Sequence, residues 1–542
     1  MKVLFLPSGT TIDAPRMTVL EATRQVGVPI IASCGGHATC GKCKVRIVTS
    51  DLDVLSPPDE TERETLSEEE LVLGVRLACR LTLPETGELT VSVTENQDDL
   101  GRKARMSILP PDFIADCKQT DEPAYGVAFD IGTTTVVGML CDLTRGMPIR
   151  AIARTNPQGI YGGDVISRIQ YAAESPEHLQ AIQRKVLDCF NEIIHRFMQE
   201  EGIARGQIKE ITVVGNTAMS HLFLGIDASS LARAPFEPVF TSAVTMLASD
   251  LGLFAAEDAK VYLLPNIAGH VGSDITAVML ATALYDLPGV NLVIDIGTNG
   301  EVLLSRKGEM LACSTAAGPA FEGASIRFGM RAAIGAIEQV DFTRGDVCLD
   351  VIGDVEPTGM CGSGLISLVA QMLDQGLITT RGRLLNRETA LEQGISETFA
   401  NRLYSDESGG GFVLHKDIVL TQKDIREVQL AKGAIAAGIE VLLDRFGLSS
   451  SEIDHVMIAG AFGNYVRVED ALRIGLLPPV LPERVVPIGN AAGVGACMAL
   501  LSAKHRELAE REAEKVLHLE LSNDASFVNK HMRAMSFPAK VI

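Results

Sequence analysis

The sequence lacks any long hydrophobic run and is short of positive charge. No stretch of the 542 residues reaches about 18 uncharged apolar residues, roughly the length that spans a bilayer. Lys and Arg number 48 against 69 Asp and Glu, and the formal net charge is -21. This balance disfavours nucleic acid and anionic membrane surfaces as partners. The segment from Met1 to Pro7 is too short and strand-like for a signal peptide, so we expect a cytoplasmic protein.

The sequence also lacks two common nucleotide-binding motifs. Neither a Walker loop nor a dinucleotide fingerprint, in which glycines lead directly into a helix, is present. A different sequence pattern occurs twice, at residues 127–140 and 292–304. It consists of an apolar run, a tight polar turn and a second apolar run. This order predicts strand, turn and strand in both copies. The turns carry Asp130, Gly132, Thr133 and Thr134 in the first copy and Asp295, Gly297, Thr298 and Asn299 in the second.

Both turns contain residue types that bind phosphate. Glycine allows backbone N–H groups to form a concave nest around an anion, and an aspartate at a strand end can hold a hydrated Mg²⁺. A single copy is equally consistent with an ordinary hairpin turn in a buried sheet. Because the pattern is repeated in matching contexts, we predict two facing hairpins that grip a nucleotide polyphosphate, with Asp130 and Asp295 at the Mg²⁺.

Four of the eleven cysteines lie close together in the sequence, and the other seven are scattered and read as small buried residues. The four are Cys34, Cys40, Cys43 and Cys79. Plant-type [2Fe-2S] ferredoxins use C-x4-C-x2-C and a distant fourth cysteine, and this spacing is one residue longer. The longer loop resembles vertebrate-type and bacterial hydroxylase-system ferredoxins. A structural zinc site usually shows two C-x2-C pairs, and this segment has one, so we predict a [2Fe-2S] cluster.

Glycine recurs after buried apolar runs in the two halves of residues 124–503, at Gly215 and Gly460. Two phosphate hairpins and a late Gly-Ala-Phe-Gly turn resemble the acetate and sugar kinase, Hsp70 and actin superfamily. The resemblance implies two ribonuclease-H-like lobes that close over ATP, with both hairpins as phosphate motifs. It assigns the adenosine turn to Gly460, Ala461 and Gly463. Residues 359–365 resemble a connecting segment, and close packing of small residues explains them equally well.

These resemblances predict an α/β multidomain protein. We expect a β-grasp ferredoxin domain at residues 1–96, a linker at 97–123, a first lobe at 124–288, a second lobe with the adenosine motif at 289–503, and a C-terminal helix and tail at 504–542. The linker is polar and marked by proline. As a flexible coil of about 27 residues it would span roughly 25–30 Å on average. Within the lobes, helical patterns cover residues 176–200 and 425–446.

Several further residues carry weaker signals. His270 is expected to be a packed or capping histidine rather than a corrinoid ligand. Ser273 or Asp274 is expected to cap the helix that follows. Glu322 lies near the second hairpin, where it could orient water, and its role stays open together with that of Cys361.

A ferredoxin tethered to an ATPase of this superfamily is similar to the reductive activators of corrinoid-dependent methyltransferases. The resemblance covers nearly the whole chain. It implies an ATP-hydrolysing enzyme that returns an inactive Co(II) corrinoid protein to Co(I) by one-electron transfer from its [2Fe-2S] cluster. Its partners would be a corrinoid protein and an upstream low-potential electron donor. Some members carry a middle domain after the ferredoxin, whereas only a short linker is expected here.

Two other functions fit the same motifs. One is a small-molecule kinase with a redox-sensing ferredoxin domain, which would transfer phosphoryl groups without any corrinoid protein. The other is a client-gating ATPase or electron carrier. The tether and the low-potential cluster favour reduction over both, although fold alone does not establish function. The sequence leaves open the corrinoid partner, the methyl donor and the oligomeric state, a homodimer included.

Overall fold

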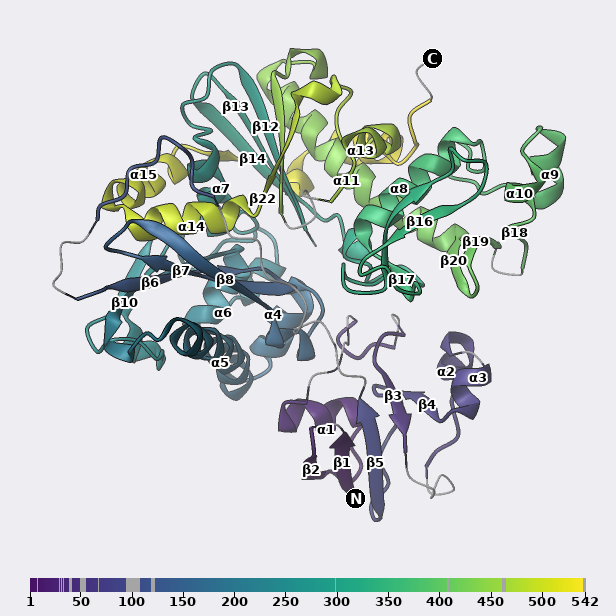
Figure 1. Cartoon of the computed structure of the whole chain (residues 1–542), viewed down its shortest axis with the longest axis horizontal. Coiled ribbons are helices and arrows are strands. Elements are labelled where there is room, and N and C mark those ends of the chain that lie inside the picture. The colour runs from purple at the N-terminus through teal and green to yellow at the C-terminus, as the bar shows by residue number, and fades with distance from the viewer. Residues whose placement is uncertain are drawn as a thin grey trace.

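The computed structural model describes the chain except for residues 7, 29, 31, 33, 39–40, 49–54, 67, 94–107, 118–121, 298, 407–408, 461–464 and 540–542. The described strands form a five-stranded sheet, two six-stranded sheets and two three-stranded sheets. Figure 1 shows the N-terminal domain in purple below the two six-stranded sheets, which lie on either side of helices α7 and α14.

The N-terminal domain is a mixed sheet in the order β2-β1-β5-β3-β4, with α1 against it. Alternate residues of β5 are buried, so one face of the sheet forms the core. A capping box between Thr18 and Glu21 starts α1, and Gly27 ends it with φ of 72°. This arrangement is the predicted β-grasp. Its elements are β1 (Lys2–Leu6), β2 (Thr10–Asp13), α1 (Val19–Val26), β3 (Lys44–Ile47), α2 (Glu60–Thr65), α3 (Glu68–Val72), β4 (Val75–Leu77) and β5 (Glu88–Val93).

The first lobe is a six-stranded sheet in the order β10-β11-β9-β6-β7-β8. The strands β6, β7 and β8 form an antiparallel meander, while β9 and β11 continue the sheet in parallel with β6. The elements are β6 (Tyr125–Ile131), β7 (Thr135–Asp142), β8 (Met147–Thr155), α4 (Val165–Ala173), α5 (Pro176–Glu201), β9 (Ile208–Gly215), α6 (Thr217–Leu224), β10 (Val244–Leu247), β11 (Lys260–Leu263) and α7 (Ser273–Thr282).

Helix α5 shows why this lobe folds as it does. Ser175 caps its first turn, Pro176 occupies the first helical position, and Gly202 ends it in the left-handed conformation. Its buried face includes Phe190 and Phe197, each with no exposed surface. Burying one such side chain stabilises the fold by about 1.5–3 kcal/mol. The helix predicted at residues 176–200 is confirmed.

The second lobe repeats this topology in the order β22-β21-β12-β13-β14-β23. Again three antiparallel strands are followed by two parallel ones. This shared order agrees with the predicted pair of ribonuclease-H-like lobes. The elements are β12 (Val290–Ile296), β13 (Gly300–Arg306), β14 (Glu309–Thr315), α11 (Gln422–Phe446), β21 (His455–Ala459), α13 (Val468–Ile474), β22 (Val485–Gly489), α14 (Ala491–Leu501) and β23 (Leu517–His518).

Residues between β14 and α11 form two small sheets and several helices at the side of the second lobe. One sheet has the order β16-β15-β17 and the other β18-β19-β20. The elements are β15 (Ala336–Asp341), β16 (Cys348–Val351), β17 (Gly359–Met360), α8 (Gly362–Asp374), α9 (Arg387–Glu392), α10 (Glu397–Ala400), β18 (Leu403–Tyr404), β19 (Gly411–His415) and β20 (Ile418–Thr421).

Helices α7 and α14 join the two lobes. A Cβ atom placed on Gly495 would lie 2.0 Å from the backbone oxygen of Ala277, so only glycine allows the two helices to approach this closely. One apolar cluster runs through both helices into both large sheets, and includes Ala128, Val278, Val293 and Cys497. The lobes therefore share a core at this hinge-like contact.

Part of the predicted linker is attached to the lobes. The N–H of Asp116 donates to the oxygen of Leu501 (2.8 Å), and its carboxylate accepts from the N–H of Ala503 (2.7 Å). Phe113 packs on His505 with ring centroids 4.9 Å apart. Phe113 and Asp116 are thus fixed on α14 and α15 (Ala503–Ala513), so this part of the predicted linker is attached to the lobes.

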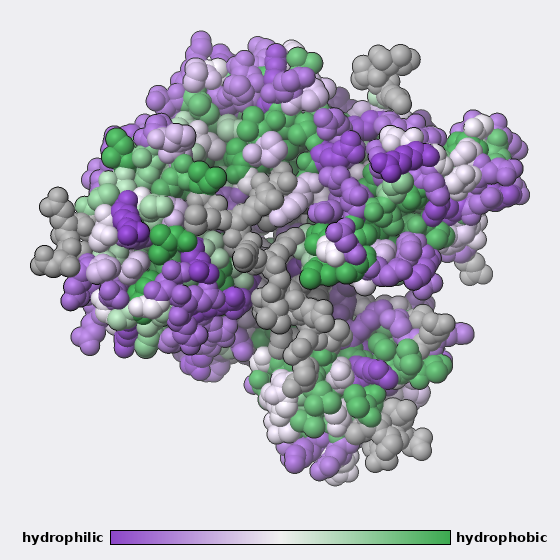
Figure 2. All heavy atoms as spheres, viewed as in Figure 1, coloured by the Kyte–Doolittle hydropathy of each residue, from purple (hydrophilic) through white to green (hydrophobic). Residues whose placement is uncertain are grey.

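The C-terminal segment also returns to the core, where α16 (Phe527–Ala534) lies along α11. The buried ammonium of Lys432 donates to the oxygen of Ser536 (2.5 Å). Figure 2 shows a largely hydrophilic periphery with hydrophobic groups between, as folded surfaces commonly have. None of the helices in the described part of the chain has the length and apolar character needed to cross a bilayer.

Candidate functional site

The first predicted phosphate hairpin joins β6 to β7. Asp130 lies near the end of β6, and the N–H of Gly132 closes the turn by donating to the oxygen of Thr135 (2.9 Å). A Cβ atom on Gly132 would lie 2.8 Å from that oxygen, so a side chain does not fit without a shift. Asn156 supports the turn by donating from Nδ2 to the oxygen of Gly132 (2.9 Å). The turn is present as predicted and its shape requires glycine.

The second hairpin joins β12 to β13 in the same way. Asp295 lies opposite Glu301 in the antiparallel register. The N–H of Gly297 donates to the oxygen of Asn299 (3.0 Å), which narrows the turn. Thr298, predicted to contact phosphate, lies outside the described residues. The repeated sequence phrase therefore corresponds to a repeated structure.

Three aspartates face one another where the lobes meet: Asp130 and Asp295 from the hairpins, and Asp274 from the first turn of α7. Burial and the charge of Asp295 raise the pKa of Asp130 to about 7, against a hydrogen bond with Asn490 that lowers it. Burial and the charges of Asp295 and Asp130 raise the pKa of Asp274 to about 8. Burial alone raises the pKa of Asp295 to about 6. These three buried carboxyl groups, which are close enough to influence one another, are called the acidic centre below.

Glu301 extends this acidic centre. Its side chain is buried, and burial together with the charges of Asp274 and Asp295 raises its pKa well above the usual value. In the described ranges no three acidic, histidine or cysteine side chains are gathered closely enough to enclose a metal ion. Mg²⁺ commonly needs only one or two carboxylates, with phosphate and water completing its octahedron. The acidic centre fits that mode of binding.

A buried arginine supports the first hairpin from behind. Arg168 is 1% exposed and donates from Nη2 to the oxygen of Thr133 (2.6 Å) and from Nε to the oxygen of Gly162 (2.9 Å). Burial lowers its pKa to about 10, so it remains charged at neutral pH. The Thr133 hydroxyl also accepts from Nδ2 of Asn216 (3.2 Å). Arg168 and Asn216 thus hold the backbone and the hydroxyl of Thr133 in place.

Glu322 connects the two hairpins. It ends a short 3-10 helix, η7 (Pro319–Glu322), in the second lobe. The hydroxyl of Thr134 in the first lobe donates to its carboxylate. The other carboxylate oxygen would lie 3.9 Å from a Cβ atom on Gly297 of the second hairpin. The side chain therefore lies between the two turns that are predicted to hold phosphate.

The predicted adenosine turn is described only at its start. Gly460 has φ of 90°, and a Cβ atom there would lie 2.8 Å from Oδ1 of Asp295, so the backbone of Gly460 packs directly against that side chain. Ala461 and Gly463 lie outside the described residues. In the 359–365 segment, a Cβ atom on Gly364 would lie 2.2 Å from the oxygen of Ile337. Close packing thus accounts for glycine at that position.

The cluster cysteines converge in the N-terminal domain. The thiols of Cys43 and Cys79 are 3.3 Å apart and buried, and their hydrogen bond lowers the pKa of Cys43. A disulfide would bring the sulfur atoms to about 2.05 Å, so both thiols remain available as ligands. Cys34 is close enough for its charge to act on Cys43. Cys40 lies outside the described residues.

Glycines bend the loop that carries these thiols. Gly35, Gly36 and Gly41 have φ of 67°, 110° and 64°, conformations that side chains disfavour. A loop of this kind lets backbone N–H groups turn toward bridging sulfides. The converging thiols of Cys34, Cys43 and Cys79 and the curved loop fit the predicted [2Fe-2S] cluster.

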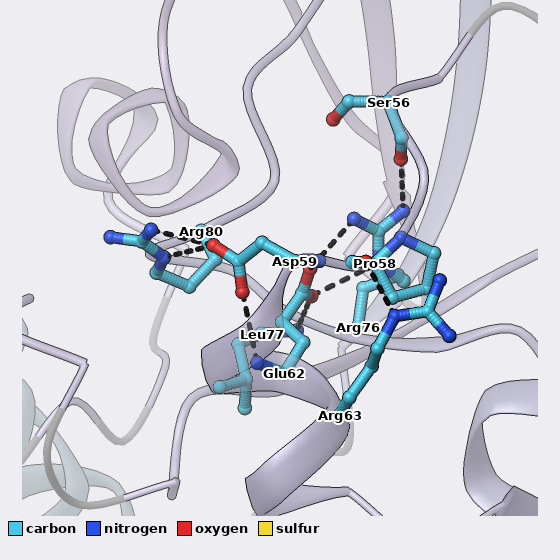
Figure 3. Close-up of polar contacts among 8 residues, drawn as sticks. All are labelled: Ser56, Pro58, Asp59, Glu62, Arg63, Arg76, Leu77 and Arg80. Atoms are coloured by element: carbon cyan, nitrogen blue, oxygen red, sulfur yellow. Dashed lines mark hydrogen bonds and ion pairs between the residues drawn. The ribbon is translucent and has the colours of Figure 1, made fainter.

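Ion pairs hold the segment that carries Cys79 (Figure 3). Arg76 donates to Glu62 through Nε (3.0 Å) and Nη2 (2.7 Å), and the two side chains are 8% and 1% exposed. The N–H of Leu77 donates to the same carboxylate (2.9 Å). Arg80 pairs with Asp59 at 2.6 Å in a more exposed position. The strand before the fourth cysteine is thereby fixed to α2.

Sequence reasoning missed three members of the acidic centre. Asp274 was expected as a possible helix cap, but the cap position is Gly272 and Asp274 faces the hairpin aspartates. Glu301 and Asn490 were not singled out. The one available signal was that Glu301 follows the second turn directly, opposite Asp295. His270 is a packed histidine as predicted, with its ring 5.0 Å from that of Phe236 and its pKa lowered by burial.

Comparison with known proteins identifies the family. Residues 4–83 match the 2Fe-2S iron-sulfur cluster binding domain, 125–287 the RACo middle region, and 289–542 the C-terminal domain of RACo, described as the ASKHA domain. Over 595 aligned positions the chain is 33% identical to corrinoid activation enzyme RamQ of Eubacterium limosum, with 100% of both chains covered. The chain belongs to the family of corrinoid reductive activators.

Two further relatives support the same family assignment. The [Co(II) methylated amine-specific corrinoid protein] reductase of Methanosarcina barkeri is 26% identical over 76% of this chain and 77% of the relative. A solved structure named reductive activator for corrinoid, iron-sulfur protein is 30% identical, has a TM-score of 0.71, and covers 99% of the activator and 98% of its own chain. The predicted family and fold class are confirmed.

One expectation about the activator was wrong. The sequence suggested that only a short linker replaces the middle domain, whereas the RACo middle region matches residues 125–287. Those residues form the first lobe of the structure. The middle region of the family and the predicted first ribonuclease-H-like lobe are therefore the same part of this chain. The match to the cluster-binding domain also supports a [2Fe-2S] cluster in the activator, and the ASKHA match supports ATP binding.

Proposed function

We propose that this activator returns a Co(II) corrinoid protein to Co(I) by one-electron transfer, and that ATP binding and hydrolysis between its lobes is coupled to the transfer. The cluster held by Cys34, Cys40, Cys43 and Cys79 would supply the single electron. The observation that carries the proposal is the presence, in one chain of this family, of converging cluster thiols and a two-hairpin acidic site. An upstream low-potential donor would reload the cluster.

The nucleotide site follows from the hairpin geometry. Asp130 and Asp295 would bind Mg²⁺, and Asp274 would set the charge around them. The backbone N–H groups and hydroxyls of the two turns would bind phosphate: Gly132, Thr133 and Thr134 in the first, and Gly297, Thr298 and Asn299 in the second. Gly460, Ala461 and Gly463 would face the adenosine. Because the turns belong to different lobes, a bound polyphosphate would draw the lobes together.

Energetics explain why ATP is needed. A plant-type cluster has a potential near about -400 mV, and every 59 mV of uphill one-electron transfer costs about 1.4 kcal/mol. If the corrinoid potential lies lower, the cluster alone cannot complete the reduction. ATP can change this only by favouring one conformation of the activator over another, in which the bound corrinoid is easier to reduce. Hydrolysis would then release the partner.

The test is a reduction assay under anaerobic conditions. The activator is chemically reduced, mixed with a candidate Co(II) corrinoid protein, and followed by visible absorption with ATP, without ATP, and with a non-hydrolysable analogue. We expect the Co(I) band only with hydrolysable ATP. Absence of Co(I) with several corrinoid proteins, despite an intact cluster and measurable ATPase activity, would refute the proposal and favour a kinase or a client-gating ATPase.

A further inference from the structure

The ferredoxin domain touches both lobes of the ATPase core with the side that carries its cluster loop. In Figure 1 this domain lies below the junction of the lobes. Arg24 of α1 makes one polar contact with the lobes, and Lys42, which lies between the predicted ligands Cys40 and Cys43, makes a second. The two contacts reach different lobes, so both can form at once only when the lobes lie in a suitable position relative to each other.

The first contact ties the cluster loop to the first lobe. Arg24 donates from Nε to the oxygen of Ile160 (2.7 Å) and from Nη2 to the oxygen of Gly35 (2.7 Å), which directly follows Cys34. Burial lowers the pKa of Arg24, and charge interactions with Tyr171, Glu21 and Glu174 act against this. A Cβ atom on Gly35 would be 3.6 Å from Cβ of Ser167 in α4. The loop is thus packed against the first lobe.

The second contact ties the same loop to the second lobe. The Lys42 ammonium donates to the oxygens of Ile326 (3.0 Å) and Gly329 (3.1 Å). These two residues form a turn, closed by the N–H of Gly329 donating to the oxygen of Ile326 (3.0 Å). A charged donor on two carbonyl groups is a strong contact that depends on the turn staying in place.

The acceptor turn of Lys42 lies four residues after Glu322. Glu322 ends η7, and a Cβ atom on the next residue, Gly323, would lie 2.9 Å from the carbonyl carbon of Gly329, so the end of the helix packs against the turn. Glu322 also accepts from Thr134 of the first hairpin. A nucleotide phosphate at that hairpin would compete for the same hydroxyl and repel the carboxylate, because both are anionic. Displacement of Glu322 would then move the turn that Lys42 holds.

We propose that Lys42 is a nucleotide-sensitive clamp: it holds the ferredoxin domain across the two lobes, and nucleotide binding between the hairpins opens it through Glu322. A rigid domain with one anchor on each lobe cannot keep both when the lobes rotate. Arg24 keeps its anchor, because Ile160 lies on the first lobe and away from η7. By thermodynamic reciprocity, opening the clamp also strengthens nucleotide binding. The inference rests on the proposed nucleotide site and specifies how that site controls access to the cluster.

The chain contains no tryptophan, which offers a direct test. Phe328 lies between the two acceptors of Lys42, so F328W places a single indole beside the clamp. An iron–sulfur cluster absorbs where indole emits, so the indole is quenched while the ferredoxin domain is docked. Fluorescence of the full chain is measured with and without a Mg²⁺-bound non-hydrolysable ATP analogue, in the F328W background and with K42Q added.

K44Q is the matched control, because the Lys44 ammonium pairs with Glu70 inside the ferredoxin domain (2.5 Å). We expect the analogue to raise the fluorescence of F328W and of F328W with K44Q. With K42Q added, we expect the fluorescence to be high without the analogue and to change little when the analogue is added. The analogue should also bind this variant at least about fivefold more tightly than it binds F328W alone. Visible absorption confirms an equal cluster content in all variants. E322Q, which leaves the clamp itself unaltered, should reduce the fluorescence rise at saturating analogue.

The outcomes separate the inference from the proposed function. If the analogue binds and the F328W fluorescence does not rise, the clamp is refuted while the nucleotide site stands. If K42Q behaves like K44Q, or if K42Q lacks the cluster and E322Q keeps the full rise, the clamp is refuted as well. If no analogue binds in a separate titration, both the nucleotide site and the clamp are overturned.

Discussion

The acidic centre predicts that Mg²⁺-dependent nucleotide binding strengthens as pH rises. With a pKa of about 7, Asp130 is mostly protonated below that pH. An ordinary surface aspartate is ionised in the same range. Its ionised fraction is about one in eleven at about pH 6 and about ten in eleven at about pH 8. Mg²⁺ binds the ionised carboxylate and competes with the proton. The affinity for Mg²⁺-bound analogue should therefore increase about tenfold between these two pH values.

Substituting Asp295 with Asn tests the origin of this dependence. The change removes a predicted Mg²⁺ ligand, and loss of a residue that supports metal binding costs about 10–100-fold in affinity. It also removes a negative charge that raises the pKa values of Asp130 and Asp274. We expect weaker binding at every pH, together with a midpoint that moves to lower pH. ATPase activity should fall while the visible spectrum of the cluster stays unchanged.

The assay is a titration with a non-hydrolysable analogue and Mg²⁺ at several pH values from about 6 to about 8. Asp350→Asn is the matched control, because Asp350 is an exposed residue of β16 and the substitution makes the same charge change away from the hairpins. A wild-type affinity that varies less than about twofold over this range would refute the argument from burial. An Asp295→Asn midpoint equal to that of the wild type would refute the role of charge repulsion, and unchanged ATPase activity would remove Asp295 from the site.

Three further substitutions test other parts of the molecule. Cys43→Ser should abolish the visible absorption of the [2Fe-2S] cluster and leave analogue binding intact. Glu62→Ala should destabilise the ferredoxin domain by about 3–5 kcal/mol in urea unfolding followed by cluster absorption, because it strands a buried arginine. Arg168→Met should weaken analogue binding about tenfold, because the backbone oxygens behind the first hairpin lose their charged donor.

Each of these substitutions has a control. Cys117→Ser changes an exposed cysteine, Glu60→Ala an exposed glutamate of α2, and Arg184→Met an exposed arginine of α5. We expect near wild-type behaviour in all three. A Cys43→Ser protein with full cluster absorption would exclude that thiol as a ligand. If the two glutamate variants had equal urea midpoints, Glu62 would not stabilise the ferredoxin domain as argued. If the two arginine variants bound the analogue equally well, Arg168 would not support the first hairpin.

Local patterns were predictable because their physics is contained in short segments. The cysteine spacing indicated a [2Fe-2S] domain, since cluster ligands and the glycines between them are neighbours in the chain. The two hairpins followed from apolar runs around glycine turns, and α5 from a cap, an apolar stripe and a terminal glycine. Their repetition was enough to predict two related lobes. The middle region was not recognised because it is itself the first of the two lobes, so the sequence showed no additional domain between the linker and the lobes.

The sequence alone was sufficient to predict a [2Fe-2S] domain and two strand–turn–strand units, because each of these depends on residues that are close together in the chain. Only the tertiary structure decided that Asp274, about 144 residues after Asp130, joins the acidic centre, because the sheet and α7 must pack before those charges meet. It likewise decided that Glu322 contacts Thr134 and that Lys42 reaches Ile326. Such contacts depend on surfaces of different domains fitting together, and no local periodicity encodes that fit.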